Sequence, residues 1–190
     1  MEPLSLTTTD GVTLEAQRHV PDGATVGVVL AHPHPLYGGS MWDGPPAWLF
    51  DALPAAGMAA VRFQFRAEHD EGRAEQLDLV AAIDALPAGL PIVLCGYSFG
   101  GWVSLHVTDQ RVRSWVAIAP PLRGDVPAAA DPRPKHLLVP EHDQYTPPNA
   151  IEPVVAGWTA TTYEVLRGTD HFLGGAMRTV VDHVVSAIHT

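Results

Sequence analysis

The residues best suited to covalent chemistry lie in one short stretch, Gly96-Tyr97-Ser98-Phe99-Gly100. An apolar run at residues 92–95 precedes it, and a helical pattern that starts with Trp102 follows it. A strand that turns sharply into a helix needs small residues two positions before and after the Ser, because strand and helix then pack closely. Such a turn would lift the Ser98 hydroxyl off the sheet. The five residues alone also fit a Gly-rich loop with an ordinary Ser, so the interpretation depends on a base and an acid elsewhere.

Two later loops offer that base and acid. A Ser hydroxyl needs a His to take its proton, and the His works best when a carboxylate fixes its tautomer. His171 lies between a predicted strand and the last predicted helix, and Asp143 follows the predicted strand at residues 135–140. Glu141 is the rival acid, Asp143 also fits an ordinary turn residue, and Asp170 is a poor partner because adjacent side chains in a loop diverge. The order Ser, Asp, His is that of the nucleophile-elbow hydrolases.

A third loop, His32-Pro33-His34-Pro35-Leu36-Tyr37-Gly38-Gly39, follows the apolar run at residues 26–31. A tetrahedral intermediate needs two N–H donors, and the amide of Phe99 would be one of them. The second would come from this loop, where Pro has no N–H, so His34, Leu36 or Tyr37 must donate it. A metal site on the His-x-His pair is disfavoured, because no third ligand with suitable spacing is nearby. The other histidines show no cluster in the sequence and are interpreted as surface or core residues: His19, His69, His106, His136, His142, His183 and His189.

The elements that would position these loops alternate along the chain. Strand-like segments at residues 4–9 and 12–20 flank Asp10-Gly11, which predicts an antiparallel hairpin. Strands and helices then alternate, which predicts a mainly parallel, twisted sheet with helices on both faces. The predicted strands are 26–31, 59–65, 91–95, 115–119, 135–140 and 161–166, and the predicted helices are 45–56, 73–86, 98–108, 147–157 and 174–188. In such sheets the site forms beyond the carboxyl ends of the strands.

Composition limits the classes of function. A chain of 190 residues with 46% hydrophobic and 17% charged residues fits one globular domain, residues 1–190. The net charge of −10 argues against a nucleic-acid or anionic-membrane partner. Cys95 has no disulfide partner and lies in an apolar run, so a buried thiol is expected. The start of the chain lacks the pattern of a signal peptide, and the apolar runs are too short for a membrane span, so we expect a cytoplasmic protein.

With three motifs in this order, the chain resembles the α/β-hydrolase superfamily over nearly its whole length. It looks like the small dienelactone-hydrolase-like bacterial esterases, which carry a His-Pro-His-Pro-x-x-Gly-Gly-x-Met loop, here residues 32–41. The resemblance implies Ser98 as nucleophile, Asp143 as acid, His171 as base and Phe99 as one oxyanion donor. Matching the loop to the His-Gly-x-Pro of related hydrolases makes His34 the second donor, with Leu36 next. One departure, Gln64 where relatives have Asn, precedes an acidic loop at residues 67–72 that bears on substrate preference.

The segment at residues 120–134 is Pro-rich and too short for a helical cap domain, which predicts an open, shallow site. We therefore expect a serine hydrolase that cleaves small or exposed carboxylic esters through an acyl-enzyme, without a metal or cofactor, as a monomer or homodimer. Alternatives are a lactone, peptide or carbon–carbon bond hydrolase on the same residues, or a non-catalytic binding protein with this fold. Residues expected to line the mouth of the site are Tyr37, Met41, Trp42 and Leu122, and the alternative is that they pack under a loop.

Overall fold

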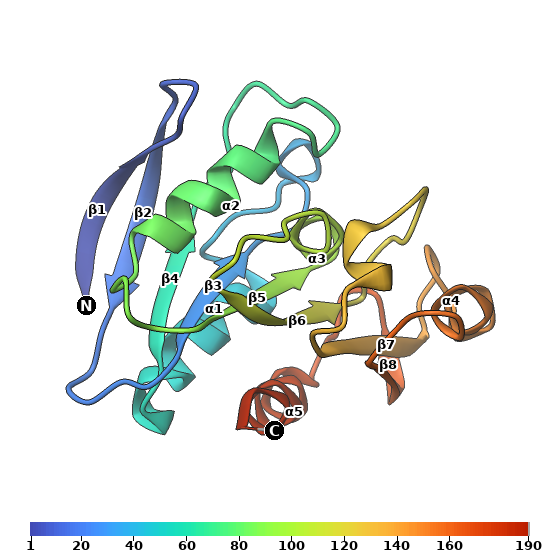
Figure 1. Cartoon of the computed structure of the whole chain (residues 1–190). Coiled ribbons are helices and arrows are strands. Elements are labelled where there is room, and N and C mark those ends of the chain that lie inside the picture. The colour runs from blue at the N-terminus through green and yellow to red at the C-terminus, as the bar shows by residue number, and fades with distance from the viewer. Residues whose placement is uncertain (190) are drawn as a thin grey trace.

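Eight strands form one twisted sheet at the centre of the molecule, in a computed structural model that describes residues 1–189 (Figure 1). The strand order is β1-β2-β4-β3-β5-β6-β7-β8. β1 and β2 form an antiparallel hairpin, β2 pairs antiparallel with β4, and all other neighbours are parallel. The strands are β1 Glu2–Thr7, β2 Thr13–His19, β3 Gly27–Ala31, β4 Ala59–Phe63, β5 Ile92–Tyr97, β6 Val112–Ile118, β7 Lys135–His142 and β8 Thr161–Asp170.

Helices cover both faces of the sheet, as the alternating pattern predicts. Core residues of α2, α3 and α4 pack on one face, and those of α1 and α5 pack on the other (Figure 1). The α-helices are α1 Gly44–Ala52, α2 Glu75–Asp84, α3 Phe99–Ser104, α4 Pro148–Val155 and α5 Met177–His189, and three 3₁₀ turns are η1 Pro35–Tyr37, η2 Pro54–Ala56 and η3 Pro127–Ala130. The chain thus has the mainly parallel, doubly covered sheet that its pattern predicts, in the α/β-hydrolase arrangement that the resemblance implies.

The central strands are buried on both faces. Every residue of β3, β4 and β5 is buried, which explains why these strands appear in the sequence as continuous apolar runs. At the edge, Gly11 has a φ of +87°, so the Asp-Gly turn between β1 and β2 adopts the left-handed conformation that glycine permits. The hairpin prediction is therefore confirmed.

The boundaries of several elements differ from the sequence prediction. The helix expected at 45–56 ends at Ala52, because Pro54 cannot continue the helical hydrogen bonds, and η2 follows. The helix after Ser98 ends at Ser104 instead of near residue 108. β7 and β8 extend to His142 and Asp170, with a register shift between Pro140 and His142. Gly168, with a φ of +69°, lies inside β8 instead of ending it.

The connection from β6 to β7 contains the turn η3 and no helical cap. It packs on the core through Ala128, which is fully buried and whose N–H donates to the Leu105 carbonyl at 3.1 Å. This short connection therefore leaves the carboxyl ends of the parallel strands without a covering domain. None of the helices within residues 1–189 is long and apolar enough to span a bilayer.

Candidate active site

Ser98 lies at the tip of the turn between β5 and α3, with a φ of +52° and a ψ of −122°. These angles are strained for a residue with a side chain, and the surrounding packing holds them. A Cβ at Gly96 would lie 2.3 Å from the carbonyl carbon of Gly100, and a Cβ at Gly100 would lie 2.4 Å from the carbonyl oxygen of Ala31. Only glycine at both positions lets α3 approach β5 and β3 closely enough to present Ser98.

A continuous chain of hydrogen bonds joins Ser98 to two residues from other loops. The hydroxyl Oγ of Ser98 lies 3.0 Å from Nε2 of His171, and Nδ1 of His171 lies 2.8 Å from Oδ2 of Asp143. Asp143 and His171 immediately follow β7 and β8, so the neighbouring parallel strands bring them together. Ser98 is partly exposed, whereas His171 and Asp143 are buried. The structure thus brings together the three residues that the sequence singles out.

The carboxylate of Asp143 is held ionised. Burial acts to raise the pKa of Asp143, but the hydrogen bonds to His171 and to the backbone N–H groups of Thr146 and Tyr145 outweigh it and lower that pKa. Those N–H groups donate to Oδ1 at 2.9 Å and 2.8 Å, which leaves Oδ2 for the imidazole. A buried anion beside Nδ1 fixes the proton there and leaves Nε2 free to accept the Ser98 proton.

The other two candidate acids, Glu141 and Asp170, form hydrogen bonds elsewhere, and Tyr97 supports the His171 backbone. Glu141 accepts the Gly168 N–H at 2.8 Å, away from the imidazole, and Asp170 accepts the Phe172 N–H at 3.1 Å within its own turn. The Tyr97 hydroxyl, from the strand that carries Ser98, donates to the His171 carbonyl at 2.7 Å. Burial raises the pKa of the Tyr97 phenol, which keeps the donor proton in place.

The His-Pro loop has three backbone N–H groups that could donate to an oxyanion, and two of them are already used inside the loop. The Tyr37 N–H donates to the His34 carbonyl at 3.0 Å, and the Leu36 N–H donates to Nδ1 of His34 at 3.2 Å. Within residues 1–189, the backbone N–H of His34 has no hydrogen-bond partner, and neither has that of Phe99 at the start of α3. The aromatic rings of these two residues pack at 4.5 Å. Both unpaired amides therefore lie beside the nucleophile turn.

The His-x-His pair is divided between two environments. His32 is fully buried, its Nε2 accepts the Phe65 N–H at 2.9 Å, and burial lowers its pKa to about 4. The His34 ring instead faces His69, with 3.2 Å between their Nε2 atoms. No group of three or more His, Cys, Asp or Glu side chains among the described residues is arranged to hold a metal ion.

Comparison with known proteins places the chain in a family. The model of the alpha/beta hydrolase family matches residues 28–188. The chain belongs to the alpha/beta hydrolase family. It is similar to the alpha-beta serine hydrolase homologue of Coxiella burnetii, with 28% identity, a TM-score of 0.87 and coverage of 97% of this chain and 96% of that one.

Two further relatives agree. The structure of XC6422 from Xanthomonas campestris, a serine hydrolase without a lid, has a TM-score of 0.84, with 23% identity and coverage of 99% of this chain and 93% of that one. An uncharacterized protein of Rickettsia prowazekii (strain Madrid E) is 27% identical, with coverage of 78% of this chain and 72% of that protein. The two structural likenesses show the same fold over nearly the whole chain.

Of the four residues expected at the mouth of the alpha/beta hydrolase site, one is misplaced. Met41 is fully buried, so the prediction that it lines the mouth is wrong. Its N–H donates to Oε1 of Gln64 at 3.0 Å, which draws this end of the loop into the core. Tyr37 is 89% exposed, Trp42 is also exposed, and Leu122 packs against the core.

Sequence reasoning missed several residues at this edge of the sheet. The sequence shows no cluster around His69, but the loop after β4 brings it into contact with His34 and Glu75. Tyr145 and Phe172 are exposed and flank the His171 ring, at centroid distances of 4.7 Å and 5.8 Å. Both aromatic residues lie close in the sequence to Asp143 or His171, and this closeness could have predicted them.

Proposed function

We propose that this alpha/beta hydrolase is a serine hydrolase that cleaves carboxylic esters of small or exposed acyl groups through an acyl-enzyme. The observation that carries the proposal is the continuous hydrogen-bond chain from the strained, partly exposed Ser98 through His171 to the buried Asp143. Each role follows from the atoms at the ends of the chain. A hydroxyl lies at one end, a buried carboxylate lies at the other, and an imidazole joins them.

The reaction proceeds in two halves. Ser98 Oγ attacks the ester carbonyl carbon while His171 Nε2 takes the hydroxyl proton, and the carbonyl oxygen becomes an oxyanion. The bond to the leaving alcohol then breaks, and His171 returns the proton to that alcohol. Water next attacks the acyl-enzyme and gives its proton to His171. The acid leaves, and Ser98 recovers its proton.

We assign the oxyanion donors to the N–H groups of Phe99 and His34. Both lack a protein partner among the described residues, whereas Leu36 and Tyr37 use their N–H groups inside the loop. A donor already committed to a hydrogen bond would have to break it to serve the oxyanion, and a preorganised site avoids that reorganisation. This argument favours His34 over Leu36.

The surroundings of Ser98 support esters with exposed acyl groups. The β6–β7 connection supplies no cap, and the exposed rings of Tyr37, Tyr145 and Phe172 offer apolar contact without enclosure. Activity towards nitrophenyl esters is therefore expected to be highest for short acyl groups. A steady increase in kcat/KM with acyl length would contradict the open site.

Replacement of Ser98 by Ala tests the proposal directly. We expect loss of hydrolysis of nitrophenyl acetate by about 10⁴-fold or more, because the remaining groups cannot form an acyl-enzyme. The circular dichroism spectrum should be unchanged, since Ala removes only the hydroxyl. Turnover equal to that of the wild type would refute the assignment.

A further inference from the structure

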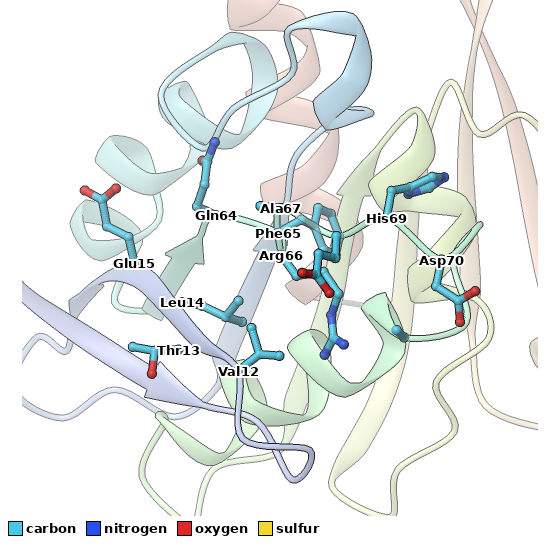
Figure 2. A pocket seen from close by; sticks show the side chains of 12 residues that line it. Val12, Thr13, Leu14, Glu15, Gln64, Phe65, Arg66, Ala67, His69 and Asp70 are labelled. Carbon is cyan, nitrogen blue, oxygen red and sulfur yellow. The ribbon is translucent and has the colours of Figure 1, made fainter.

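Beside the Ser98 site lies a pair of hydrogen-bonded histidines, His34 and His69, whose rings the proposed mechanism does not use. The His34 ring contacts the rings of His69 and Phe99 at centroid distances of 4.3 Å and 4.5 Å. His69 belongs to the loop after β4, at one end of a groove of about 650 Å³ whose opposite end carries Glu15 (Figure 2). Two loops that are far apart in the sequence therefore meet through these rings, next to the nucleophile turn.

The buried carboxylate of Glu75 lies against the second ring nitrogen of His69. Nδ1 of His69 lies 2.5 Å from Oε1 of Glu75, whose side chain is 1% exposed, in the first turn of α2. The same carboxylate accepts the backbone N–H groups of Asp70 and Gly72 at 3.0 Å and 2.9 Å. Glu75 thus fixes both the backbone of the loop that carries His69 and the His69 ring itself.

Hydrogen-bond donors and acceptors leave one arrangement of protons. His34 Nδ1 accepts the Leu36 N–H, so the proton of a neutral His34 must be on Nε2. That proton points at Nε2 of His69, which must therefore accept it and carry its own proton on Nδ1. The His69 Nδ1–H then faces the Glu75 carboxylate. Both nitrogens of His34 and Nε2 of His69 therefore take part in hydrogen bonds, and Nδ1 of His69 lies in a close ion-pair contact with Glu75 that lacks hydrogen-bond geometry.

We propose that His69 and Glu75 are positioning residues that hold the His34 loop, and with it the His34 N–H, in the geometry that stabilises the oxyanion. This inference rests on the proposed function, since it assigns a purpose to the oxyanion donor. The Leu36–His34–His69–Glu75 series, called the relay below, fixes the His34 ring at both of its nitrogens. The backbone of the same residue accepts the N–H groups of Tyr37 and Gly39, so the ring and the backbone are held together.

Burial, more than the neighbouring groups, keeps His34 neutral. Burial lowers the pKa of His34, and the nearby His69 and Arg123 act in the same direction. Only Glu75 opposes them. These groups come from the loop after β4, from the β6–β7 connection and from α2, and the α3 residue packed on the ring is the uncharged Phe99. At neutral pH His34 is therefore uncharged, as the proton arrangement described above requires.

The test compares His69→Phe, which keeps a ring on Phe99 but removes both nitrogens, with His69→Gln, whose amide oxygen can still accept the His34 proton. His136→Phe is the matched control, because His136 bonds to Thr162 on β8 near the start of β7, at the opposite end of the sheet. Circular dichroism and thermal melting establish that each variant is folded.

We expect His69→Phe to lower kcat roughly tenfold with KM nearly unchanged, because misplacing an oxyanion donor costs less than the ~10²–10³-fold loss on removing one. His69→Gln should recover most of that loss, and His136→Phe should match the wild type. A folded His69→Phe with wild-type kcat, or with a change in KM alone, would overturn the inference.

A second readout does not depend on activity. Long-range ¹H–¹⁵N spectra of the wild type at pH 8 should show the Nε2–H tautomer for His34 and the Nδ1–H tautomer for His69. The opposite tautomer at either residue would overturn the relay, even if His69→Phe fails to fold. A wild type that hydrolyses no ester would instead contradict the proposed function, and this inference with it. Wild-type activity retained in His69→Phe would contradict the inference alone.

Discussion

Two histidine chains flank the nucleophile turn, and they differ in the group at their outer end. At the buried end of each chain lies a carboxylate, Asp143 in one and Glu75 in the other. The His171 chain ends outwardly on the Ser98 hydroxyl, whereas the relay ends on the backbone N–H of Leu36. A hydroxyl can give up its proton and become a nucleophile, but an amide at neutral pH cannot. Similar residues therefore support proton transfer on one side and only positioning on the other.

After Ser98→Ala, the largest effect is expected where the His171 chain loses the negative charge of Asp143. Asp143→Asn keeps the shape of the side chain, but it removes the negative charge that stabilises the imidazolium. The amide can also hold the imidazole in the wrong tautomer. We expect kcat to fall by about 10⁴-fold, as in other triads of this type. Steady-state kinetics on nitrophenyl acetate measure it, and a loss below tenfold would show that Asp143 is not the acid.

A second prediction concerns the glycine where the two regions touch. A Cβ at Gly100 would lie 2.4 Å and 2.5 Å from the carbonyl oxygens of Ala31 and His32, which lead into the His34 loop. Gly100→Ala should push that loop from the nucleophile turn and destabilise the fold by about 1–3 kcal/mol. Urea unfolding measures the free energy. Gly124→Ala is no neutral control, since Gly124 has a φ of +65°. The matched control is Gly89→Ala, where nothing lies within 4 Å of an added Cβ and φ is not in the left-handed region. Equal stability of the Gly100 and Gly89 variants would contradict the close approach.

A smaller effect is expected at the support of the His171 loop. Tyr97→Phe removes the buried hydrogen bond to the His171 carbonyl, worth about 1 kcal/mol of unfolding free energy. It keeps the ring, so the nucleophile turn should be unchanged. Chemical denaturation of the two proteins, with kcat measured in parallel, gives the result. If the hydroxyl is dispensable, both values will equal those of the wild type.

The smallest expected effect is a dependence on pH of the kcat ratio between the wild type and His69→Phe. Because burial holds the pKa of His34 below its usual 6.5, the relay is intact above that pKa and is lost as pH falls through it. The ratio of kcat between wild type and His69→Phe should therefore be largest near pH 8 and approach one in acid. A ratio that stays constant down to the lowest pH at which both proteins are folded would show that His34 does not titrate.

Much of this arrangement could be predicted from the sequence. The strand–helix alternation and the Asp-Gly turn indicate the sheet, and Ser98, Asp143 and His171 follow strand ends in an informative order. Their meeting depends on the order of the parallel strands, which places β5, β7 and β8 in the same half of the sheet. Proximity of three side chains at one sheet edge is the kind of feature that local patterns report well.

The rest depends on loop shape, which local patterns do not report. His69 is 35 residues from His34, and their contact requires a loop whose backbone is held by Glu75. Met41 lies in a polar loop, yet its amide bonds to Gln64 and draws its side chain into the core. The strand predicted at residues 161–166 continues through Gly168 to Asp170. In each case a long-range contact decides the conformation. The predicted oligomeric state and cellular location stay predictions.

The most direct test of the account is a crystal structure of the protein after reaction with a small fluorophosphonate, which mimics the tetrahedral intermediate. We predict a covalent bond from phosphorus to Ser98 Oγ, with the phosphonyl oxygen about 2.7–3.1 Å from the backbone nitrogens of both Phe99 and His34. An adduct at another residue, or none, would contradict the nucleophile assignment. A Ser98 adduct whose oxygen faces solvent or the Leu36 N–H would contradict the role given to His34.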